Sequence, residues 1–331
     1  MKVFISVLKY VIFLGLGLGI FFYVYPLEEI DPLMDKLKSA NYWYVLPVVI
    51  IAIASHFARA YRWRMLIEPV GHKVKTFSTF RSIMIGYYFN TLVPRMGEVS
   101  RCVALNKIEK VPVSTALGTV ITERIFDLIS LMLIVGITVL AQFDIVGEYI
   151  LNLFSEKLNG IQSSFSWQTI LFIAGFLLLL GLLYFLVKKM GVYDKILNLI
   201  SEFKKGLFSV KNLKSPLLFI GYTIFIWLGY YFMCYLSFMT VDGTSHLGLS
   251  AGLVVFTLST IGFIAPVPGG VGTYQFMFTL ALSFYFIDDL SAKTVAMIAF
   301  MGNTLLNLIV GAICLFFSPK KSTDDAPQAV S

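Results

Sequence analysis

Residues 90–101 read NTLVPRMGEVSR and interrupt a largely apolar part of the chain. The stretch carries Arg95, Glu98 and Arg101 together with a proline and a glycine. The segments on either side, FRSIMIGYYF before it and VALNKIEKVPVSTALGTVITERIFDL after it, are mostly apolar. Charges and helix-breaking residues in such surroundings require either an aqueous loop or a polar region that protein or water covers.

The composition indicates an all-α, polytopic helical membrane protein. Of the 331 residues, 58% are hydrophobic and 14% are charged, whereas a soluble domain usually carries about 25% charged residues. The mean hydropathy is +0.82, and several apolar runs approach the roughly 20 residues of a membrane-spanning helix. We expect one transmembrane domain over residues 1–320 and a disordered cytoplasmic tail over residues 321–331.

Six segments are long enough to cross a bilayer as full spans: roughly 4–25, 44–64, 113–140, 168–187, 216–239 and 293–317. The first is read as a spanning helix rather than a signal peptide, because no small-residue cleavage site follows it. Two further apolar regions, 77–107 and 248–287, are interrupted by Pro and Gly.

Basic residues orient the chain, because Lys and Arg are retained on the cytoplasmic side. They concentrate in residues 59–81 and 188–214 and at Lys320–Lys321, whereas 28–35 and 288–289 are acidic. The bias places both termini in the cytoplasm and the protein in the cell inner membrane. Residues 188–214 alternate apolar and basic residues, which is typical of an amphipathic helix on an anionic leaflet.

Every loop obeys the charge rule if each interrupted region enters and leaves on one side, as a re-entrant helical hairpin. The second half, about 165–320, is then the first half, about 1–143, turned upside down. PRMGEV at 94–99 and PVPGGV at 266–271 share the pattern P-x-x-G-x-V at an offset of 172 residues. The alternative is that Pro and Gly merely bend spanning helices.

Inverted repeats with broken helices are typical of transporters, with the substrate site where the repeats meet. Backbone N–H groups freed at helix ends suit an anionic group such as a lipid phosphate. The residues predicted to form the two hairpin tips are Pro94, Gly97, Pro266, Pro268, Gly269, Gly270 and Gly272.

The segment ITERIFDL places Glu123, Arg124 and Asp127 in or near the hydrocarbon, where each charge costs about 2.5–3.5 kcal/mol. Glu123 and Asp127 share a helix face, so Arg95 and Arg101 of the neighbouring hairpin are their predicted partners. This set forms either a hydrated cavity for a charged headgroup or a fixed ion-pair network that locks the hairpin.

Arg59 and Arg62 near the end of the second span form either a basic mouth for lipid phosphates or a plain topology signal. After the second tip, Tyr274 and Gln275 are candidates for facing the cavity. The loop around them lacks the Gly-Lys-Ser/Thr ending of a phosphate loop. The three cysteines have no metal-ligand spacing, so we expect neither a metal nor a cofactor.

Four motifs, RAYRWRMLI, GYYFNTLVPRMGEVSR, TERIFD and APVPGGVGTYQ, resemble the flippase-like integral membrane family. This family comprises the transmembrane domain of lysylphosphatidylglycerol synthases and related uncharacterised membrane proteins. The resemblance covers about residues 10–317 and implies lipid translocation between leaflets. Besides the tip residues, the matching positions are Arg62, Asn90, Arg95, Glu98, Arg101, Glu123, Arg124 and Asp127. Full synthases continue into an aminoacyl-transferase domain, and since this chain stops at Ser331 we expect no such reaction.

These observations favour a transporter, not an enzyme, that moves a phosphate-bearing lipid. The lipid would be a phospholipid, an aminoacylated phospholipid or a polyprenyl-phosphate-linked sugar. The implied partners are lipids with anionic headgroups and a lipid-synthesising enzyme, not nucleic acid. The alternatives are a membrane-embedded lipid-modifying transferase and a non-transporting partner that regulates or anchors such an enzyme.

Overall fold

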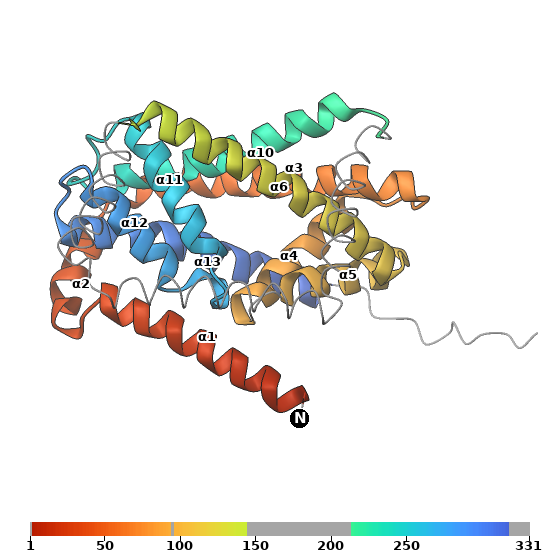
Figure 1. The fold of residues 1–331 in the computed structure, drawn as a ribbon, viewed down its shortest axis with the longest axis horizontal. Helices are drawn as coiled ribbons and strands as arrows, with labels where there is room; N and C mark the ends of the chain where they lie inside the picture. Colours follow the sequence, from red (N-terminus) through yellow and green to blue (C-terminus); the bar gives the residue numbers. More distant parts are fainter. Residues whose placement is uncertain (1, 94–95, 144–212, 318–331) are drawn as a thin grey trace, which may run out of the picture. The chain divides into compact units, whose positions relative to one another are not determined.

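The computed structural model describes residues 2–93, 96–143 and 213–317. These residues form α-helices joined by short 3-10 turns and contain no strand (Figure 1), as the all-α prediction requires. The chain divides into two compact units, residues 1–131 with 212–331 and residues 132–211. Helix α6 (Val113–Ala141) continues from the first unit into the second. All contacts described below lie within the first unit.

Four helical segments are long and apolar enough to cross a membrane: Tyr42–Val70, Val113–Ala141, Pro216–Thr240 and Asp289–Phe316. A fifth arises if the bent pair Val11–Val24 and Leu27–Ser39 counts as one span. The predicted span at 168–187 lies outside the described residues. The chain is therefore a multi-pass helical membrane protein with four or five candidate spans in its described part.

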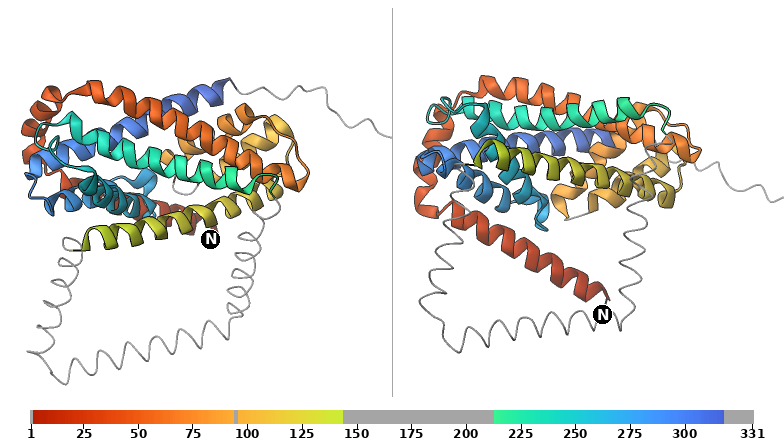
Figure 2. Two further views of the ribbon diagram at one scale, coloured as in Figure 1. Left: turned by 90° about the horizontal axis from the view of Figure 1, so that it is seen from above. Right: turned by 45° about the horizontal axis from the view of Figure 1, so that its top comes forward.

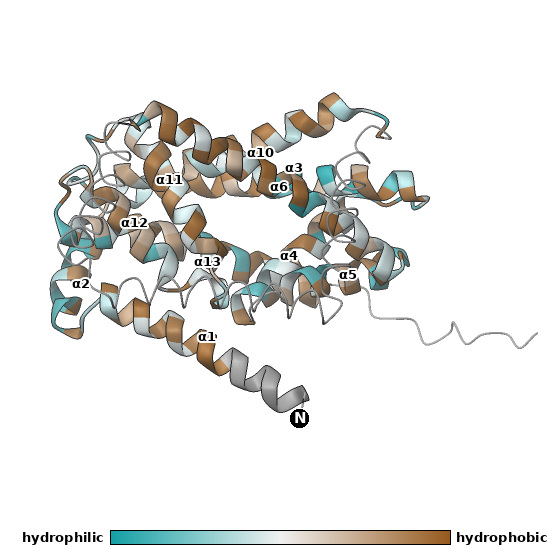
Figure 3. Cartoon of the chain, viewed as in Figure 1, coloured by the Kyte–Doolittle hydropathy of each residue, from teal (hydrophilic) through white to brown (hydrophobic). Residues whose placement is uncertain are grey.

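The long helices expose apolar side chains, as expected of surfaces in contact with lipid. On α13 (Asp289–Phe316), Leu305, Ile309 and Ile313 repeat every four residues and are each about half exposed. In water such a stripe would be unfavourable, whereas lipid tails are its natural solvent. Figure 3 shows hydrophobic residues over most of α10 (Pro216–Ser237) and α11 (Leu249–Ile264).

Helices α3 (Val45–Ile67) and α10 run side by side in opposite directions (Figure 2). At one end the Asn41 amide donates a hydrogen bond to the Thr240 carbonyl, at 2.8 Å. At the other end Glu68 and Lys214 line one small cavity. These two ends correspond to the acidic and basic sides predicted from charge.

The N-terminal helix α1 (Lys2–Val24) is followed by α2 (Ile30–Ser39), where the sequence led us to expect an acidic loop. That prediction was wrong. Leu33 of α2 is buried, and Leu37 packs against the same apolar cluster. The spacing of these leucines gives α2 an apolar face, so its acidic residues occupy the other face.

Each interrupted region forms a pair of packed helices. Helices α4 (Thr76–Leu92) and α5 (Met96–Glu109) make the first hairpin, and α11 and α12 (Thr273–Ser283) make the second. Their lengths of 17, 14, 16 and 11 residues are below the roughly 20 residues that a span needs.

The hairpins open at opposite ends of the first unit, and the tip of the second reaches the first. The Lys75 amide donates to Glu109 at 3.2 Å, which joins the open ends of the first hairpin on the basic side. The second hairpin opens on the acidic side, near Asp288. At its tip, a Cβ on Gly269 would lie 3.6 Å from Thr91 Cα, in the last turn of α4.

Glycines make the second tip possible. The φ angles of Gly269, Gly270 and Gly272 are +59°, +77° and +80°, in the left-handed region that other residues rarely adopt. Pro266 and Pro268 lie in the same break between α11 and α12. In the first hairpin, Pro94 lies outside the described residues, and Gly97 falls in the first turn of α5 rather than in the break.

An ion-pair cluster joins α2 to the start of α13 on the acidic side. Lys293 lies 2.5 Å from both Glu29 and Asp289, and Lys36 lies 3.2 Å from Asp288. Partial burial alone would raise the pKa of Asp288. Hydrogen bonds from Ser291 and Lys36 outweigh that effect and hold its pKa below the usual value.

Candidate functional site

Five charged side chains from three helices meet inside the first unit, and we call them the arginine–carboxylate cluster: Arg59 and Arg62 of α3, Arg101 of α5, and Glu123 and Asp127 of α6. Arg62 and Glu123 are fully buried, and Arg59 and Arg101 are nearly so. Since isolated buried charges are very costly, such groups occur only where they neutralise one another.

Glu123 is the centre of the cluster. Its Oε1 accepts hydrogen bonds from Arg59 Nε at 2.7 Å and from Arg62 Nη2 at 3.2 Å. Its Oε2 accepts one from Arg101 Nη1 at 2.9 Å. One carboxylate therefore ties α5 to α3 and α6, and so fixes the first hairpin to two long helices.

Asp127 follows one turn later on the same face of α6. Its Oδ1 accepts from Arg62 Nη2 at 2.6 Å, and its Oδ2 accepts from Arg59. Arg124, which is 41% exposed, lies 3.2 Å from Asp127 and 2.7 Å from Glu98. Arg124 and Glu98 thus form the more accessible rim of the cluster.

Hydroxyl groups complete the coordination of the two α3 arginines. The Nη1 group of Arg59 donates to the hydroxyls of Tyr87 on α4 and Tyr230 on α10, at 3.1 and 3.2 Å. Arg62 Nη1 donates to Thr223 on α10 at 3.1 Å. Helix α10, from the second half of the chain, is therefore part of the site.

The guanidinium of Arg101 is held by one edge only. It lies over the ring of Trp63, 4.9 Å from its centroid, and Trp63 is itself fixed by a 3.0 Å hydrogen bond to Thr119. The Nε and Nη2 groups of Arg101 are buried and have no hydrogen-bond partner among the described residues, and the same holds for Arg62 Nε. Buried donors without protein partners are rare and are typical of positions that bind a ligand or water.

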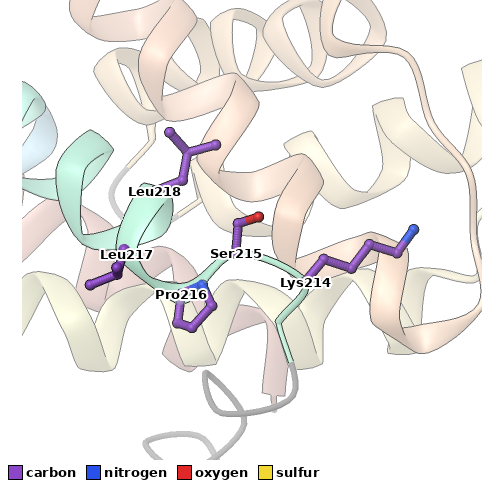
Figure 4. Close-up of a pocket in the computed structure, with 5 residues that line it drawn as sticks. All are labelled: Lys214, Ser215, Pro216, Leu217 and Leu218. Carbon is purple, nitrogen blue, oxygen red and sulfur yellow. The ribbon is translucent and has the colours of Figure 1, made fainter.

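A separate pocket lies at the start of α10. It has a volume of about 640 Å³ and is lined by Lys214, Ser215, Pro216, Leu217 and Leu218. Figure 4 shows Lys214 extending from the chain just before α10. The arginine–carboxylate cluster, by contrast, is closed in this structure.

Comparison with known proteins places the chain in a family. The family described as the lysylphosphatidylglycerol synthase TM region matches residues 6–312. The chain belongs to this family. The matched range contains every residue of the arginine–carboxylate cluster. The cluster therefore lies within the domain that defines the family.

Two relatives come from the archaeon Methanocaldococcus jannaschii, and both are described as UPF0104 membrane proteins. MJ1595 is 24% identical over 318 residues, which cover 86% of this chain and 88% of the relative. MJ1078 is 26% identical over 233 residues, which cover 69% and 93%. No solved structure matches the chain. The family relationship therefore establishes a membrane protein of this class.

The structure brings together most of the residues that the sequence singled out in the first half. The predicted pairing of Arg101 with the acidic pair on α6 is observed at Glu123. Arg95, the other predicted partner, lies outside the described residues. Asn90 lies at the crossing of α4 and α5. A Cβ added to Gly97 would be 2.8 Å from the Cβ of Asn90.

Tyr274 and Gln275 make their described contacts away from the cluster. Gln275 is buried, and its Oε1 accepts a 2.8 Å hydrogen bond from the Gly272 amide, so it stabilises the second tip. Tyr274 packs among aromatic rings, including those of Phe263 and Phe300.

Nothing in the sequence marked Tyr87 and Tyr230 as site residues. The sequence predicted Arg62 as a binding residue and placed Arg59 and Arg62 either in a basic mouth or in a plain topology signal, but they are 6% and 0% exposed. The reason is that α3 continues to Ile67, so both arginines lie well inside the helix. Their spacing of one turn, on a helix that extends beyond them, was the available signal.

Proposed function

We propose that this protein moves a phosphate-bearing lipid between the two leaflets of the membrane. The observation that carries the proposal is the buried cluster with unpartnered guanidinium donors on Arg101 and Arg62. Arginine recognises phosphate by paired N–H donors, and an intramembrane charge cluster is a functional site by default.

Arg101 offers the edge that a phosphate needs. Its Nη1 group is taken by Glu123, while Nε and Nη2, which form the other fork of the guanidinium, are unpartnered. Once the cluster opens, a pair of phosphate oxygens would bind this fork without displacing Glu123. Stacking on Trp63 holds the Arg101 guanidinium in place, so these two N–H donors are preorganised to bind an oxyanion.

The arrangement of helices supports an inverted repeat. Helices α3 and α10 begin 171 residues apart, and α4 and α11 end 172 residues apart. The two hairpins open at opposite ends, and the second tip lies against α4. In this proposal each hairpin re-enters the membrane from one face, as in transporters built from inverted repeats.

Transport then requires the cluster to open. The headgroup passes along the arginines while its acyl tails remain in lipid beside the apolar outer faces of the long helices. Glu123 and Asp127 balance the arginines when no headgroup is bound. In this proposal the protein is a transporter rather than an enzyme, and it lies in the cell inner membrane with both termini in the cytoplasm.

Leaflet exchange in proteoliposomes tests the proposal. Purified protein is reconstituted with fluorescent phosphatidylglycerol, an aminoacylated analogue or a polyprenyl phosphate, and exchange is followed by quenching from outside. Arg101→Lys keeps the charge but loses the fork, so exchange should fall by about tenfold or more, the loss expected when about 1.4 kcal/mol of binding disappears. Arg64→Lys, at the surface pair with Glu68, is the matched control and should exchange normally.

Three outcomes separate the proposal from its alternatives. Equal exchange by Arg101→Lys and the wild type would make the cluster a structural lock. Absence of exchange for every lipid by well-folded wild type would reject transport. Chemical conversion of the lipid, detected by mass spectrometry without a second protein, would instead favour a lipid-modifying transferase.

A further inference from the structure

His56 lies one helical turn before Arg59, on the same face of α3, and it contacts none of the five charged side chains through a hydrogen bond of normal geometry. The residue is 4% exposed. Neither ring nitrogen makes a hydrogen bond of normal geometry within the described part of the chain. A buried imidazole has one donor or acceptor at each nitrogen. Asn307 can serve one of them, so at least one polar atom of the ring remains unsatisfied.

The surroundings of His56 link it to the cluster. Its ring lies 5.0 Å from the ring of Tyr87 on α4, whose hydroxyl accepts a hydrogen bond from Arg59. On α13 the side chain of Asn307 lies beside the ring, and its Oδ1 also lacks a partner among the described atoms. From α10, Tyr230 reaches the same Arg59 nitrogen as Tyr87.

A proton on His56 would be unfavourable in this closed arrangement. It would add a further buried positive charge one turn from Arg59, and among the described residues no carboxylate forms an ion pair with the ring. Such a charge requires water or an anion. A state in which the cluster has opened would supply both, so the proton binds the open state better than the closed one.

We propose that His56 is the proton-binding site that couples a proton gradient to the opening of the arginine–carboxylate cluster. This inference rests on the proposed lipid transport. A ligand that binds one conformation more tightly shifts the population toward it. Protonation of His56 therefore weakens the hold of Arg59 on Glu123 and Asp127 and admits the headgroup.

The chain offers matched controls for a transport test. His72, which is partly exposed, and His246, which is exposed, lie in connecting segments. His72→Gln and His246→Gln therefore change the same residue type outside the cluster. Leaflet exchange by the wild type should rise up to about tenfold between pH 7.5 and 5.5. This is the change in the protonated fraction of an ordinary imidazole, which His56 resembles once the cluster has opened to water. His56→Gln should lose this rise, and both controls should keep it.

A second readout does not depend on the lipid. Cys102, next to Arg101, is fully buried, so opening of the cluster should expose its thiol to a water-soluble maleimide. Labelling is measured by mass spectrometry in membranes at pH 5.5 and 7.5, and each variant is compared with the wild type at the same pH. The pH-dependent gain should disappear in His56→Gln and persist in His72→Gln.

The two readouts distinguish the failure of each claim. A pH-dependent exposure of Cys102 that His56→Gln abolishes, without exchange of any lipid, would support the proton site and reject lipid transport. Lipid exchange whose pH dependence is unchanged in His56→Gln would support transport and overturn the inference.

Discussion

Among single residues, Glu123 has the largest share in holding the cluster together. It accepts hydrogen bonds from three arginines on two different helices, and its side chain is fully buried. The neutral amide of a glutamine has similar size but cannot balance that charge. The arginines would then remain buried with Asp127 as their main counter-charge, which is the situation that makes broken buried ion pairs costly.

Glu123→Gln should therefore lower the free energy of unfolding by about 3–5 kcal/mol. The change can be followed in detergent by the fluorescence of the tryptophans, which include Trp63 beside Arg101. Glu68→Gln, which breaks the partly exposed pair with Arg64, should cost at most about 1 kcal/mol. Equal losses in the two variants would contradict the central role given to Glu123.

The residues of the site were only partly predictable from the sequence. The spacing of Glu123 and Asp127 correctly indicated a shared face, and charge balance indicated Arg101 as a partner. Tyr87 and Tyr230 carry no such signal, because a tyrosine on an apolar helix has no pattern that marks it as a site residue. Their role follows only from the structure, in which both hydroxyls accept a hydrogen bond from Arg59. Tertiary packing, and not local pattern, brings those helices together.

At the level of elements, the first hairpin depends on a glycine crossing. A Cβ on Gly97 would lie 2.6 Å from the carbonyl oxygen of Gly86, and one on Gly86 would lie 2.7 Å from that of Gly97. No side chain can enter such a contact without separating the helices. The crossing therefore sets how closely α5 brings Arg101 to Glu123.

Gly97→Ala should destabilise the protein by about 1–3 kcal/mol, as overpacking of a tight contact does, and should also reduce lipid exchange. The matched control is Gly118→Ala in α6, where an added Cβ meets nothing within 4 Å. That change should stabilise the helix by up to about 1 kcal/mol. Thermal unfolding of both variants in one detergent decides the matter, and a tolerated Gly97→Ala would rule out the tight crossing.

The start of α13 provides a pH-dependent prediction. Asp288 accepts a 2.8 Å hydrogen bond from the Ser291 amide and caps the helix, and its pKa lies below the usual value. A lowered pKa means that this stabilisation is present above the unfolded-state value of about 3.9. It is lost as the pH falls through the lower, folded-state value.

Asp288→Ala should cost about 1 kcal/mol at pH 7, typical of a lost helix cap, and progressively less as the pH falls below about 4. Asp35→Ala, at the exposed pair with Lys38, serves as the control and should have little effect at either pH. Unfolding midpoints measured from pH 3 to 7 test this. A loss for Asp288→Ala that stayed constant over this range would contradict the capping role.

The elements themselves were largely predictable. Apolar runs gave α3, α6, α10 and α13 to within a few residues, because a membrane span is specified mainly by length and hydropathy. Pro and Gly located the break in the second hairpin. The acidic stretch that became α2 was misread because its charges were given more weight than the helical spacing of Leu33 and Leu37.

At the scale of the whole molecule, we propose that two hairpins enter the membrane from opposite faces and protect charges that would otherwise lie in lipid. The sequence supported this only through the distribution of Lys and Arg and one repeated six-residue pattern. The structure adds contacts between distant segments, such as the approach of Gly269 to Thr91. Helix periodicity alone cannot specify such contacts.

The most direct test is the sidedness of four introduced cysteines in a background that lacks the native ones. Lys73 precedes the first hairpin and Lys107 lies in its last helical turn, while Ser245 and Phe286 flank the second hairpin; all four are exposed. In sealed vesicles of known orientation, an impermeant maleimide should label both positions of the first hairpin from the cytoplasmic face and both positions of the second from the opposite face. Labelling of the two ends of either hairpin from different faces would show that it crosses the membrane and would contradict the claim.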